Sequence, residues 1–302
     1  MSADFAIIRN DSQKIWVSAM QISGVVILYY PNEGEVIRNI DSYIEHVSRL
    51  FVFANSDCSK NCVESIKSIS SKIVFISNES NEGIAKVLNK SLELLSDKSE
   101  WLLTMDQDSY FEPTYAAAYF DSFNRLFSQS ENIAVVCPNH SSNSRADAVD
   151  DKFKEVIHAI TSGSIINVKI CRQLNGFEEK LFIDDVDFEY CYRCVIAGYK
   201  IIQFSNIYLN HSLGTEKEIG YFSVFKKSDR SIHSPFRVYY MVRNFLYVSS
   251  KYKKHLPEEI KQQRKQLLII LKNNLLFSGK FFKVLVAAIK GYLHFKLDKF
   301  SS

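Results

Sequence analysis

The chain has 302 residues, of which 46% are hydrophobic and 24% charged, with only 10 Gly and 5 Pro. This composition excludes a collagen-like, low-complexity or globally disordered chain and predicts a globular protein with a substantial core. The net charge of +3 hides an asymmetry, because residues 251–302 hold 12 Lys and Arg against 3 Asp and Glu. Residues 1–250 therefore hold 25 of the 37 basic and 31 of the 34 acidic side chains and are mildly acidic. The strongly basic C-terminal end suits an anionic partner.

The first 21 residues are expected to form an N-terminal extension without the basic start and long apolar stretch of a secretory signal. No run in the chain approaches the roughly 18 uncharged apolar residues of a membrane-spanning helix. Six scattered cysteines suit the reduced thiols of a cytoplasmic protein. Cys191 and Cys194 have the spacing of half a zinc site, but no second Cys/His pair stands at finger spacing, so we expect thiols that pack in the core.

Short apolar runs alternate with helical patterns through the first half of the chain. Continuous hydrophobicity is typical of parallel strands that are covered on both faces. The predicted strands are Gly24–Tyr30, Leu50–Ala54, Lys72–Ser77 and Trp101–Met105. The predicted helices between them are Glu35–Val47, Asn61–Ser70 and Gly83–Leu95. This order predicts an α/β fold with a doubly wound, mostly parallel sheet and right-handed crossovers.

The second half begins with further strands and ends with helices. The strands are predicted at Ile133–Cys137, Ser164–Val168 and Ile201–Leu209, and the helices at Glu258–Phe277 and Lys280–Lys296. We therefore expect one α/β domain over residues 22–235 and a basic, helical C-terminal extension over residues 236–302.

An Asp-x-Asp pair directly follows the strand Trp101–Met105, where Asp106 and Asp108 are separated by Gln107. Ligands of open parallel sheets bind beyond the carboxyl ends of the strands, and two such carboxylates can face one hard divalent cation. The cation would act as a Lewis acid on a departing diphosphate. A solvated turn or a helix cap before Glu112-Pro113 has the same spacing, so spacing alone leaves both interpretations open.

A second acidic cluster contains Asp184, Asp185 and Asp187 among apolar residues. Partial burial would raise the pKa of at least one of these carboxylates, as a general base requires. The cluster equally suits the N-terminus of a helix that starts near Asp185. In such a helix Glu189 and Arg193 would share a face and form an ion pair on the protein surface.

Taken together, these segments resemble the inverting family 2 glycosyltransferases of the GT-A fold, especially bacterial rhamnosyltransferases that build O-antigen and related polysaccharides. The resemblance covers roughly residues 22–250 and rests on the order and spacing of short motifs that are weak alone. These motifs are Asn81–Asn89 (NEGIAKVLN), Leu103–Ser109 (LTMDQDS), Thr161–Ser164 (TSGS), Phe182–Glu189 (FIDDVDFE), His211–Gly214 (HSLG) and Arg237–Asn244 (RVYYMVRN).

The resemblance implies a metal site. Asp106 and Asp108 would hold Mg²⁺ or Mn²⁺ together with the nucleotide diphosphate. His211 would complete the metal shell, as a histidine at this place does in many GT-A enzymes. A histidine satisfied by loop hydrogen bonds is the alternative for His211.

The resemblance also implies a general base. The alignment puts Asp187 at that position, while Asp184 and Asp185 remain alternatives because Val186 stands where many relatives have an acidic residue. The base would deprotonate an acceptor hydroxyl that attacks the anomeric carbon opposite the departing nucleoside diphosphate. Inversion would follow in one displacement, without a covalent sugar–enzyme intermediate.

For the donor nucleotide the resemblance implies a larger set of residues. Many relatives carry an Asp after the second strand, where this chain reads Ala54-Asn55-Ser56-Asp57, so Asn55 and Asp57 are candidate substitutes. The donor-site set is Tyr30, Asn55, Asp57, Asn81, Gly83, Asn89, Asp106, Gln107, Ser162, Gly163, Arg237 and Arg243. As alternatives to donor binding, Asn81, Gly83 and Asn89 would belong to an exposed turn at a helix N-terminus. Arg237 and Arg243 would instead lie on a helix that packs against the sheet.

The C-terminal segments Gln266–Phe277 and Lys280–Phe300 mix large apolar residues with regularly placed lysines. One interpretation is an amphipathic surface that lies on the anionic cytoplasmic leaflet. The other is a set of helices that pack on the body while their lysines snorkel. Nucleic acid is not expected as a partner, because no recognised module accompanies the charge.

The sequence and its resemblance thus predict a cytoplasmic, metal-dependent, inverting glycosyltransferase. The membrane interpretation of its C-terminus would place it peripherally on the cytoplasmic face of the inner membrane, and the packing interpretation would not. Its expected donor is dTDP-L-rhamnose, and its expected acceptor is a growing, lipid-linked surface glycan. The alternatives are the same chemistry with a UDP- or GDP-sugar and a catalytically silent scaffold that binds nucleotide sugars. A glycoside hydrolase also uses paired carboxylates, but the strand order and the Asp-x-Asp pair at a strand end argue against it.

Overall fold

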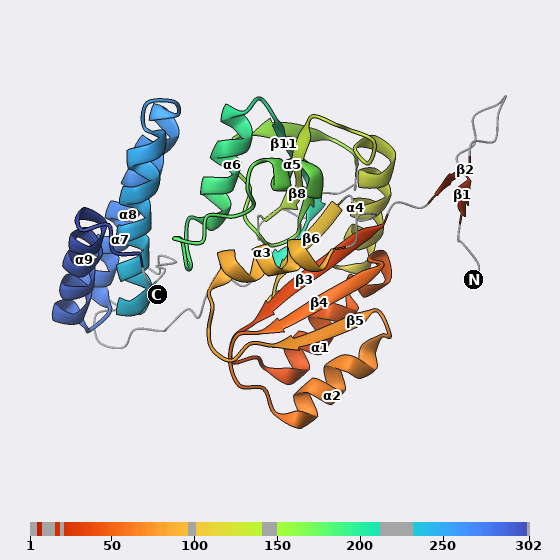
Figure 1. Cartoon of the computed structure of the whole chain (residues 1–302), viewed down its shortest axis with the longest axis horizontal. Coiled ribbons are helices and arrows are strands. Elements are labelled where there is room, and N and C mark those ends of the chain that lie inside the picture. Colours follow the sequence, from red (N-terminus) through yellow and green to blue (C-terminus); the bar gives the residue numbers. More distant parts are fainter. Residues whose placement is uncertain are drawn as a thin grey trace, which may run out of the picture.

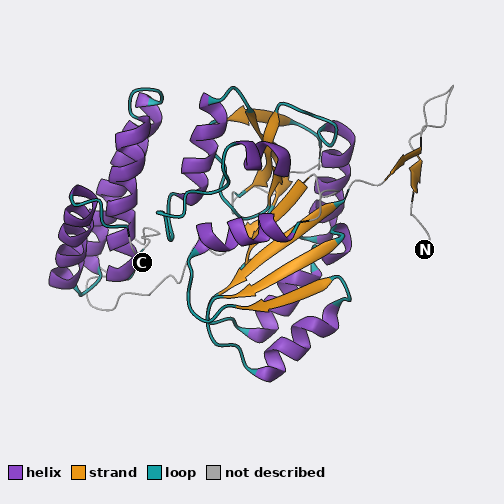
Figure 2. Ribbon diagram, viewed as in Figure 1, coloured by secondary structure: helices purple, strands orange, loops and turns teal. Residues whose placement is uncertain are grey.

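The computed structural model describes residues 5–7, 16–18, 21–95, 101–140, 150–211 and 232–300. At its centre lies an eight-stranded sheet in the order β5-β4-β3-β6-β10-β8-β11-β9, with helices on both faces (Figure 1, Figure 2). Its strands are β3 (Ile22–Leu28), β4 (Arg49–Ala54), β5 (Ile73–Ser77), β6 (Trp101–Asp106), β8 (Ile133–Asn139), β9 (Phe153–Val156), β10 (Ser164–Asn167) and β11 (Lys200–Tyr208). The predicted strands are confirmed to within two residues, and β9 was not predicted.

The sheet is mostly parallel, as expected, but two of its strands run the other way. Strands β5, β4, β3 and β6 are parallel neighbours, and β11 is parallel to β8. Strand β10 lies antiparallel between β6 and β8, and β9 lies antiparallel on the edge beside β11. Because β10 is reversed, the loop before it meets the carboxyl end of β6, with Ser164 opposite Thr104.

Small two-stranded sheets complete the strands of the described residues. Strand β1 (Phe5–Ile7) pairs with β2 (Trp16–Ser18), and β7 (Ser109–Tyr110) pairs with β12 (Asn210–His211). The second pair brings a segment from the end of β11 back to the turn that follows β6.

Some of the helices begin at a side chain that satisfies one of their free N–H groups. Asn32 accepts a hydrogen bond from Glu35 N–H, and Ser59 accepts one from Cys62 N–H, so both act as N-caps. The helices are α1 (Glu33–Asp41), α2 (Lys60–Ile69), α3 (Ile84–Leu94), α4 (Pro113–Leu126), α5 (Val168–Gln173), α6 (Val186–Ile196), α7 (Pro235–Tyr252), α8 (Pro257–Phe277) and α9 (Phe281–Lys296).

One predicted helix is shorter than expected. The pattern over Glu35–Val47 predicted a single helix, but α1 ends at Asp41 and a short 3-10 turn, Ile44–His46, follows. The Ser42 hydroxyl donates to the Asn39 carbonyl oxygen at 2.7 Å, and its oxygen accepts from Phe111 N–H at 3.1 Å. These tertiary bonds stop the helix while its apolar side chains continue into the core.

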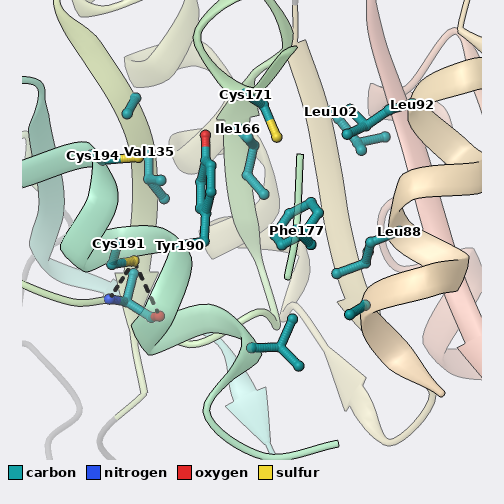
Figure 3. Packing of buried hydrophobic residues seen from close by; sticks show 14 of the residues in the cluster. Leu88, Leu92, Leu102, Val135, Ile166, Cys171, Phe177, Tyr190, Cys191 and Cys194 are labelled. Carbon is teal, nitrogen blue, oxygen red and sulfur yellow. Dashed lines mark hydrogen bonds between the residues drawn. The ribbon is translucent and has the colours of Figure 1, made fainter. Parts of the chain in front are cut away.

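Each face of the sheet carries its own hydrophobic core. Val25 and Val26 of β3 point to opposite faces, and each is only 1% exposed. Helices α3, α5 and α6 cover one face, and α1, α2 and α4 cover the other. Figure 3 shows the first cluster, in which Cys171, Cys191 and Cys194 lie among Leu, Val and aromatic side chains. The Cys191/Cys194 pair is thus part of the core packing.

Helices α7, α8 and α9 follow the sheet in the chain and lie side by side at one end of the molecule (Figure 1). A Cβ on Gly291 of α9 would lie 2.6 Å from the carbonyl oxygen of Tyr239 in α7, so glycine permits a very close approach of these two helices. Among the helices that the structure describes, none is long and apolar enough to cross a membrane.

Candidate active site

A cleft of about 920 Å³ opens at the carboxyl ends of β3 and β6. Helices α3, α6, α7 and α8 contribute its other walls. Loops that follow parallel strands converge at this edge of a sheet, which makes it the expected ligand site. The polar residues in its lining are Asn55, Asn81, Asp106, Gln107, Asp108, Thr161, Asp184, Asp185, Asp187, His233, Ser234, Arg237, Gln263 and Gln266.

Asp106 and Asp108 both line this cleft, and Gln107 between them holds the turn in place. Oε1 of Gln107 accepts a hydrogen bond from Tyr29 N–H at 2.9 Å, while Nε2 donates to the Tyr29 carbonyl oxygen at 3.1 Å. The Gln107 carbonyl oxygen accepts from Asn39 Nδ2 at 2.8 Å. Gln107 therefore links the end of β6 to the end of β3 through hydrogen bonds. Asp106 and Asp108 lie on either side of Gln107 in the sequence.

The pairing of β12 with β7 brings His211 to this turn. Its backbone lies opposite Ser109, the residue after Asp108, while its side chain lies outside what the structure describes. Carboxylates suit Mg²⁺ or Mn²⁺, and Mg²⁺ commonly binds through one or two of them plus substrate phosphates. Within the described ranges, no group of three or more Asp, Glu, His or Cys side chains is arranged so that it could hold a metal ion by itself. The Asp pair thus fits a cation whose other ligands come from phosphate oxygens, water or His211.

Asp187 lies in the first turn of α6 and lines the same cleft. Burial raises the pKa of its carboxyl from 3.8 to about 6, with the Phe188 N–H acting in the lowering direction and the charge of Asp106 in the raising one. Phe188 N–H donates to Oδ1 at 2.9 Å, and Thr161 N–H donates to Oδ2 at 3.2 Å. A carboxylate that is oriented by two backbone donors and titrates near neutrality has the properties of a general base.

Asp184 and Asp185 stand immediately before α6 in left-handed backbone conformations, with φ of 63° and 61°. Such conformations are costly for residues other than glycine and persist where the surroundings hold them. Arg237 of α7 binds the Asp184 carboxylate, and Nε2 of Gln263 in α8 donates to Asp185 Oδ1 at 3.2 Å. Burial, together with the charges of its two acidic neighbours, raises the pKa of Asp185 well above its usual range.

The N-terminus of α3 forms another wall of the cleft. Gly83 has a φ of 79°, and a Cβ there would lie 2.5 Å from the carbonyl oxygen of Phe182. The same oxygen accepts Ile84 N–H at 2.7 Å. Asn55 Nδ2 donates to the Gly83 carbonyl oxygen at 3.3 Å, and Asn81 Oδ1 accepts Gly83 N–H at 3.0 Å. Gly83 is therefore required for the close contact between α3 and the acidic segment before α6.

Several residues of the predicted donor site lie outside the lining of the cleft. They are Tyr30, Asp57, Asn89, Ser162, Gly163 and Arg243. Tyr29 lines the cleft next to Tyr30, which is 71% exposed. Ser162 lies behind the lining and accepts a hydrogen bond from Asp106 N–H at 3.3 Å, which places it as a support for the Asp-x-Asp turn.

Asn89 and Arg243 have contacts that account for them structurally. Asn89 Oδ1 accepts Phe177 N–H at 2.8 Å and so ties α3 to the loop after α5. Arg243 is fully buried, and its Nη2 donates to the Lys180 carbonyl oxygen at 2.8 Å. Both residues thus hold the segment from Phe177 to Lys180, which leads into the acidic cluster, although both are far from that segment in sequence.

The contribution of α8 to the cleft was not predicted from the sequence. Gln263, Gln266, Leu267 and Ile270 lie on one side of α8 and enter the lining. Their spacing of three and four residues shows that they share a helix face, which was readable from the sequence. Which part of the protein this face of α8 lies opposite could not be predicted, because that depends on the tertiary position of α8 relative to the sheet domain.

The mostly parallel sheet, its flanking helices and the cleft at its carboxyl edge are those of the GT-A glycosyltransferase fold. The chain is similar to the mannosyltransferase PcManGT from Pyrobaculum calidifontis in complex with GDP-Man and Mn²⁺ (TM-score 0.56, 11% identity, 91% of this chain and 74% of that one). It is also similar to S. aureus TarS 1-349 in complex with UDP-GlcNAc (TM-score 0.53, 14% identity, 91% and 80% covered).

In sequence, the chain resembles the dTDP-rhamnosyl transferase RfbF of Shigella flexneri, with 28% identity over 193 residues. That match covers 59% of this chain and 62% of the relative's length. No family model matches the chain. These likenesses confirm the GT-A fold and the resemblance to rhamnosyltransferases.

Proposed function

We propose that the chain is a metal-dependent, inverting glycosyltransferase that moves L-rhamnose from dTDP-L-rhamnose to a lipid-linked glycan of a bacterial surface polysaccharide, in the cytoplasm. The observation that carries this proposal is Asp187, whose pKa is raised to about 6 in the cleft that Asp106 and Asp108 also line. A general base works best when its pKa lies near the working pH. The match to a dTDP-rhamnosyl transferase supports rhamnose as the transferred sugar.

In the proposed reaction, the Asp187 carboxylate accepts the proton of an acceptor hydroxyl. That oxygen forms a bond to the anomeric carbon from the face opposite the diphosphate, the bond to dTDP breaks, and the configuration inverts. The N–H groups of Thr161 and Phe188 hold the base in orientation. A divalent cation held by Asp106 and Asp108 would stabilise the negative charge of the leaving diphosphate.

A panel of nucleotide sugars tests the donor. The purified chain is incubated with dTDP-L-rhamnose, UDP-sugars and GDP-sugars, and release of the nucleoside diphosphate is measured with and without chelator. We expect turnover of dTDP-L-rhamnose that chelator abolishes and that Mn²⁺ or Mg²⁺ restores. A preference for UDP-sugars would overturn the assignment of rhamnose while keeping the transferase.

Single substitutions test the catalytic residues. We expect Asp187→Asn to lower kcat by about 10²–10⁴-fold, the usual contribution of a general base. Asp106→Asn and Asp108→Asn should weaken binding of dTDP in the presence of Mn²⁺. The matched control is Asp121→Asn, because Asp121 is an exposed residue of α4. It should change neither kcat nor dTDP binding. Donor binding without turnover, unchanged by Asp187→Asn, would instead identify a silent scaffold.

A further inference from the structure

Helix α9 places its small residues inward and its large apolar residues outward. Val284 and Gly291 are buried, and Gly291 lies directly against α7, whereas Phe282 is 77% exposed and Val286 64% exposed. The outward stripe contains Phe282, Leu285, Val286, Ile289 and Leu293. These residues follow the spacing i, i+3, i+4, i+7 and i+11, which is that of one continuous helix face.

Contacts with α7 hold the inner face of α9, and they determine that its large apolar side chains point outward. The Gly291 contact leaves no room for a Cβ between α9 and α7. On the same side, the Tyr239 hydroxyl lies 2.9 Å from Nδ1 of His294 in a hydrogen bond. Rotation of α9 to bury its large side chains would break both contacts.

Basic residues border the apolar stripe. Lys283 and Lys290, seven residues apart, lie along one edge of it, and both are exposed. Helix α8 separately carries a shallow groove of its own, lined by four basic and two aliphatic residues. They are Lys261, Arg264, Lys265, Leu268, Ile269 and Lys272.

We propose that the outward face of α9 is a docking surface for an anionic lipid bilayer. The apolar side chains would enter the boundary between headgroups and acyl chains, while the bordering lysines contact anionic headgroups. Charge selects this occupant over a second copy of the chain. An antiparallel two-fold dimer through the same face would bring the lysine edges of both copies together, and such like-charge contacts are unfavourable. The basic excess of residues 251–302, 12 Lys and Arg against 3 Asp and Glu, favours an anionic surface in any arrangement.

Co-sedimentation of the full chain with vesicles tests this docking. The vesicles are pure phosphatidylcholine or phosphatidylcholine with phosphatidylglycerol, at low and at high salt. We expect binding to the anionic vesicles at low salt, weaker binding at high salt and little binding to the neutral vesicles. Val286→Glu with Ile289→Glu should abolish binding. Lys283→Glu with Lys290→Glu should weaken it by about fivefold or more for each reversed charge.

Matched substitutions elsewhere control for net charge and exposed apolar area. Lys154→Glu with Lys169→Glu reverses two exposed lysines of the sheet region, and Leu94→Glu charges a side chain that is 46% exposed. Both controls should keep wild-type vesicle binding. All variants should keep wild-type thermal unfolding and dTDP binding, because the substituted side chains lie outside the cleft.

Each of three results would overturn the proposal. The first is absence of binding to anionic vesicles at low salt, and the second is binding that the α9 and control variants reduce equally. The third is a dimer in sedimentation velocity that Val286→Glu with Ile289→Glu dissociates, which would assign the face to a second copy. Neither result depends on the identity of the donor sugar.

Discussion

The guanidinium of Arg237 forms a fork on the carboxylate of Asp184, with Nη2 and Nε donating to Oδ1 at 2.9 and 3.0 Å. Nε also lies 3.3 Å from Oδ2. Asp184 has a left-handed backbone, so this contact from α7 holds the turn that leads into α6. Arg237, assigned from the resemblance to the donor site, thus has a partner on the acidic segment that carries Asp187.

Replacing Arg237 tests whether it positions the acidic segment. We expect Arg237→Gln to lower kcat by roughly 10²-fold, because misplacing a catalytic group by about 1 Å costs that much. The kcat of Arg237→Lys should lie between those of the wild type and Arg237→Gln, because lysine keeps the positive charge but cannot form the two-pronged contact with the carboxylate. Initial rates at varied donor concentration check this. A raised KM with an unchanged kcat would show instead that Arg237 acts on the donor itself.

The pH dependence of the reaction should report Asp187. Its carboxyl must be ionised to accept a proton, so kcat/KM should rise with pH through about 6 and then level off. Asp187→Asn should remove this rising limb together with most of the activity. A profile measured on the wild type that stays flat between pH 5 and 7, by contrast, would exclude Asp187 as the base.

The same residue should make the protein less stable as the pH rises. The folded-state pKa of Asp187 is raised, so its favourable contribution is complete below its unfolded pKa of 3.8 and is lost as the pH passes through about 6. Ionisation of this carboxyl should then cost up to about 3 kcal/mol. Asp187→Asn should accordingly gain stability relative to the wild type between pH 4 and pH 8, as measured by urea unfolding. Equal stabilities at all pH values would contradict this.

The sequence predicted the sheet better than it predicted the site. Continuous apolar runs such as Leu50–Ala54 mark strands covered on both faces, and the structure confirms them. The reversed direction of β10 was not predictable, because Ser164–Asn167 is buried along its whole length and the pattern is the same whichever way the strand runs. Strand β9 is exposed along most of its length, so no hydrophobic pattern indicated it.

The site was predicted where residues adjacent in sequence form it. The Asp106/Asp108 pair and the acidic cluster around Asp187 do share one cleft, but their roles as metal ligands and base stay predictions. Residues brought together by distant segments were missed, such as Gln263 beside Asp185. The buried contacts of Arg243 were also missed, because its partner is a carbonyl oxygen 63 positions away, which no sequence pattern marks.

Gly83 should tolerate no side chain. In Gly83→Ala the new Cβ would meet the Phe182 carbonyl oxygen, and the left-handed φ of 79° would add strain. We expect a loss of about 2 kcal/mol or more in the free energy of unfolding, together with weaker dTDP binding. Gly34→Ala in α1 is the control, because its Cβ would find its nearest neighbour at 3.8 Å. That change should stabilise the protein by up to about 1 kcal/mol, and a Gly83→Ala protein as stable as this control would refute the argument.

Glu189 is the buried centre of an ion-pair network between α6 and α7. Its side chain is 0% exposed, and Oε2 accepts Arg193 Nη2 at 2.8 Å. Oε1 accepts Lys251 Nζ at 2.9 Å and the Tyr252 hydroxyl at 2.6 Å. The sequence predicted the Glu189–Arg193 pair, which is confirmed, but as a surface contact. The two α7 partners make it a link between the helix of Asp187 and the C-terminal helices.

Breaking this network should cost far more than breaking an exposed pair. Glu189→Ala leaves Arg193 and Lys251 without their carboxylate and should lower the free energy of unfolding by about 3–5 kcal/mol. The control is Glu45→Ala, whose carboxylate lies 3.5 Å from Lys72 Nζ and is 79% exposed. It should cost about 0–1 kcal/mol. Urea unfolding at pH 7 measures both, and equal losses would mean that burial does not strengthen the Glu189 network.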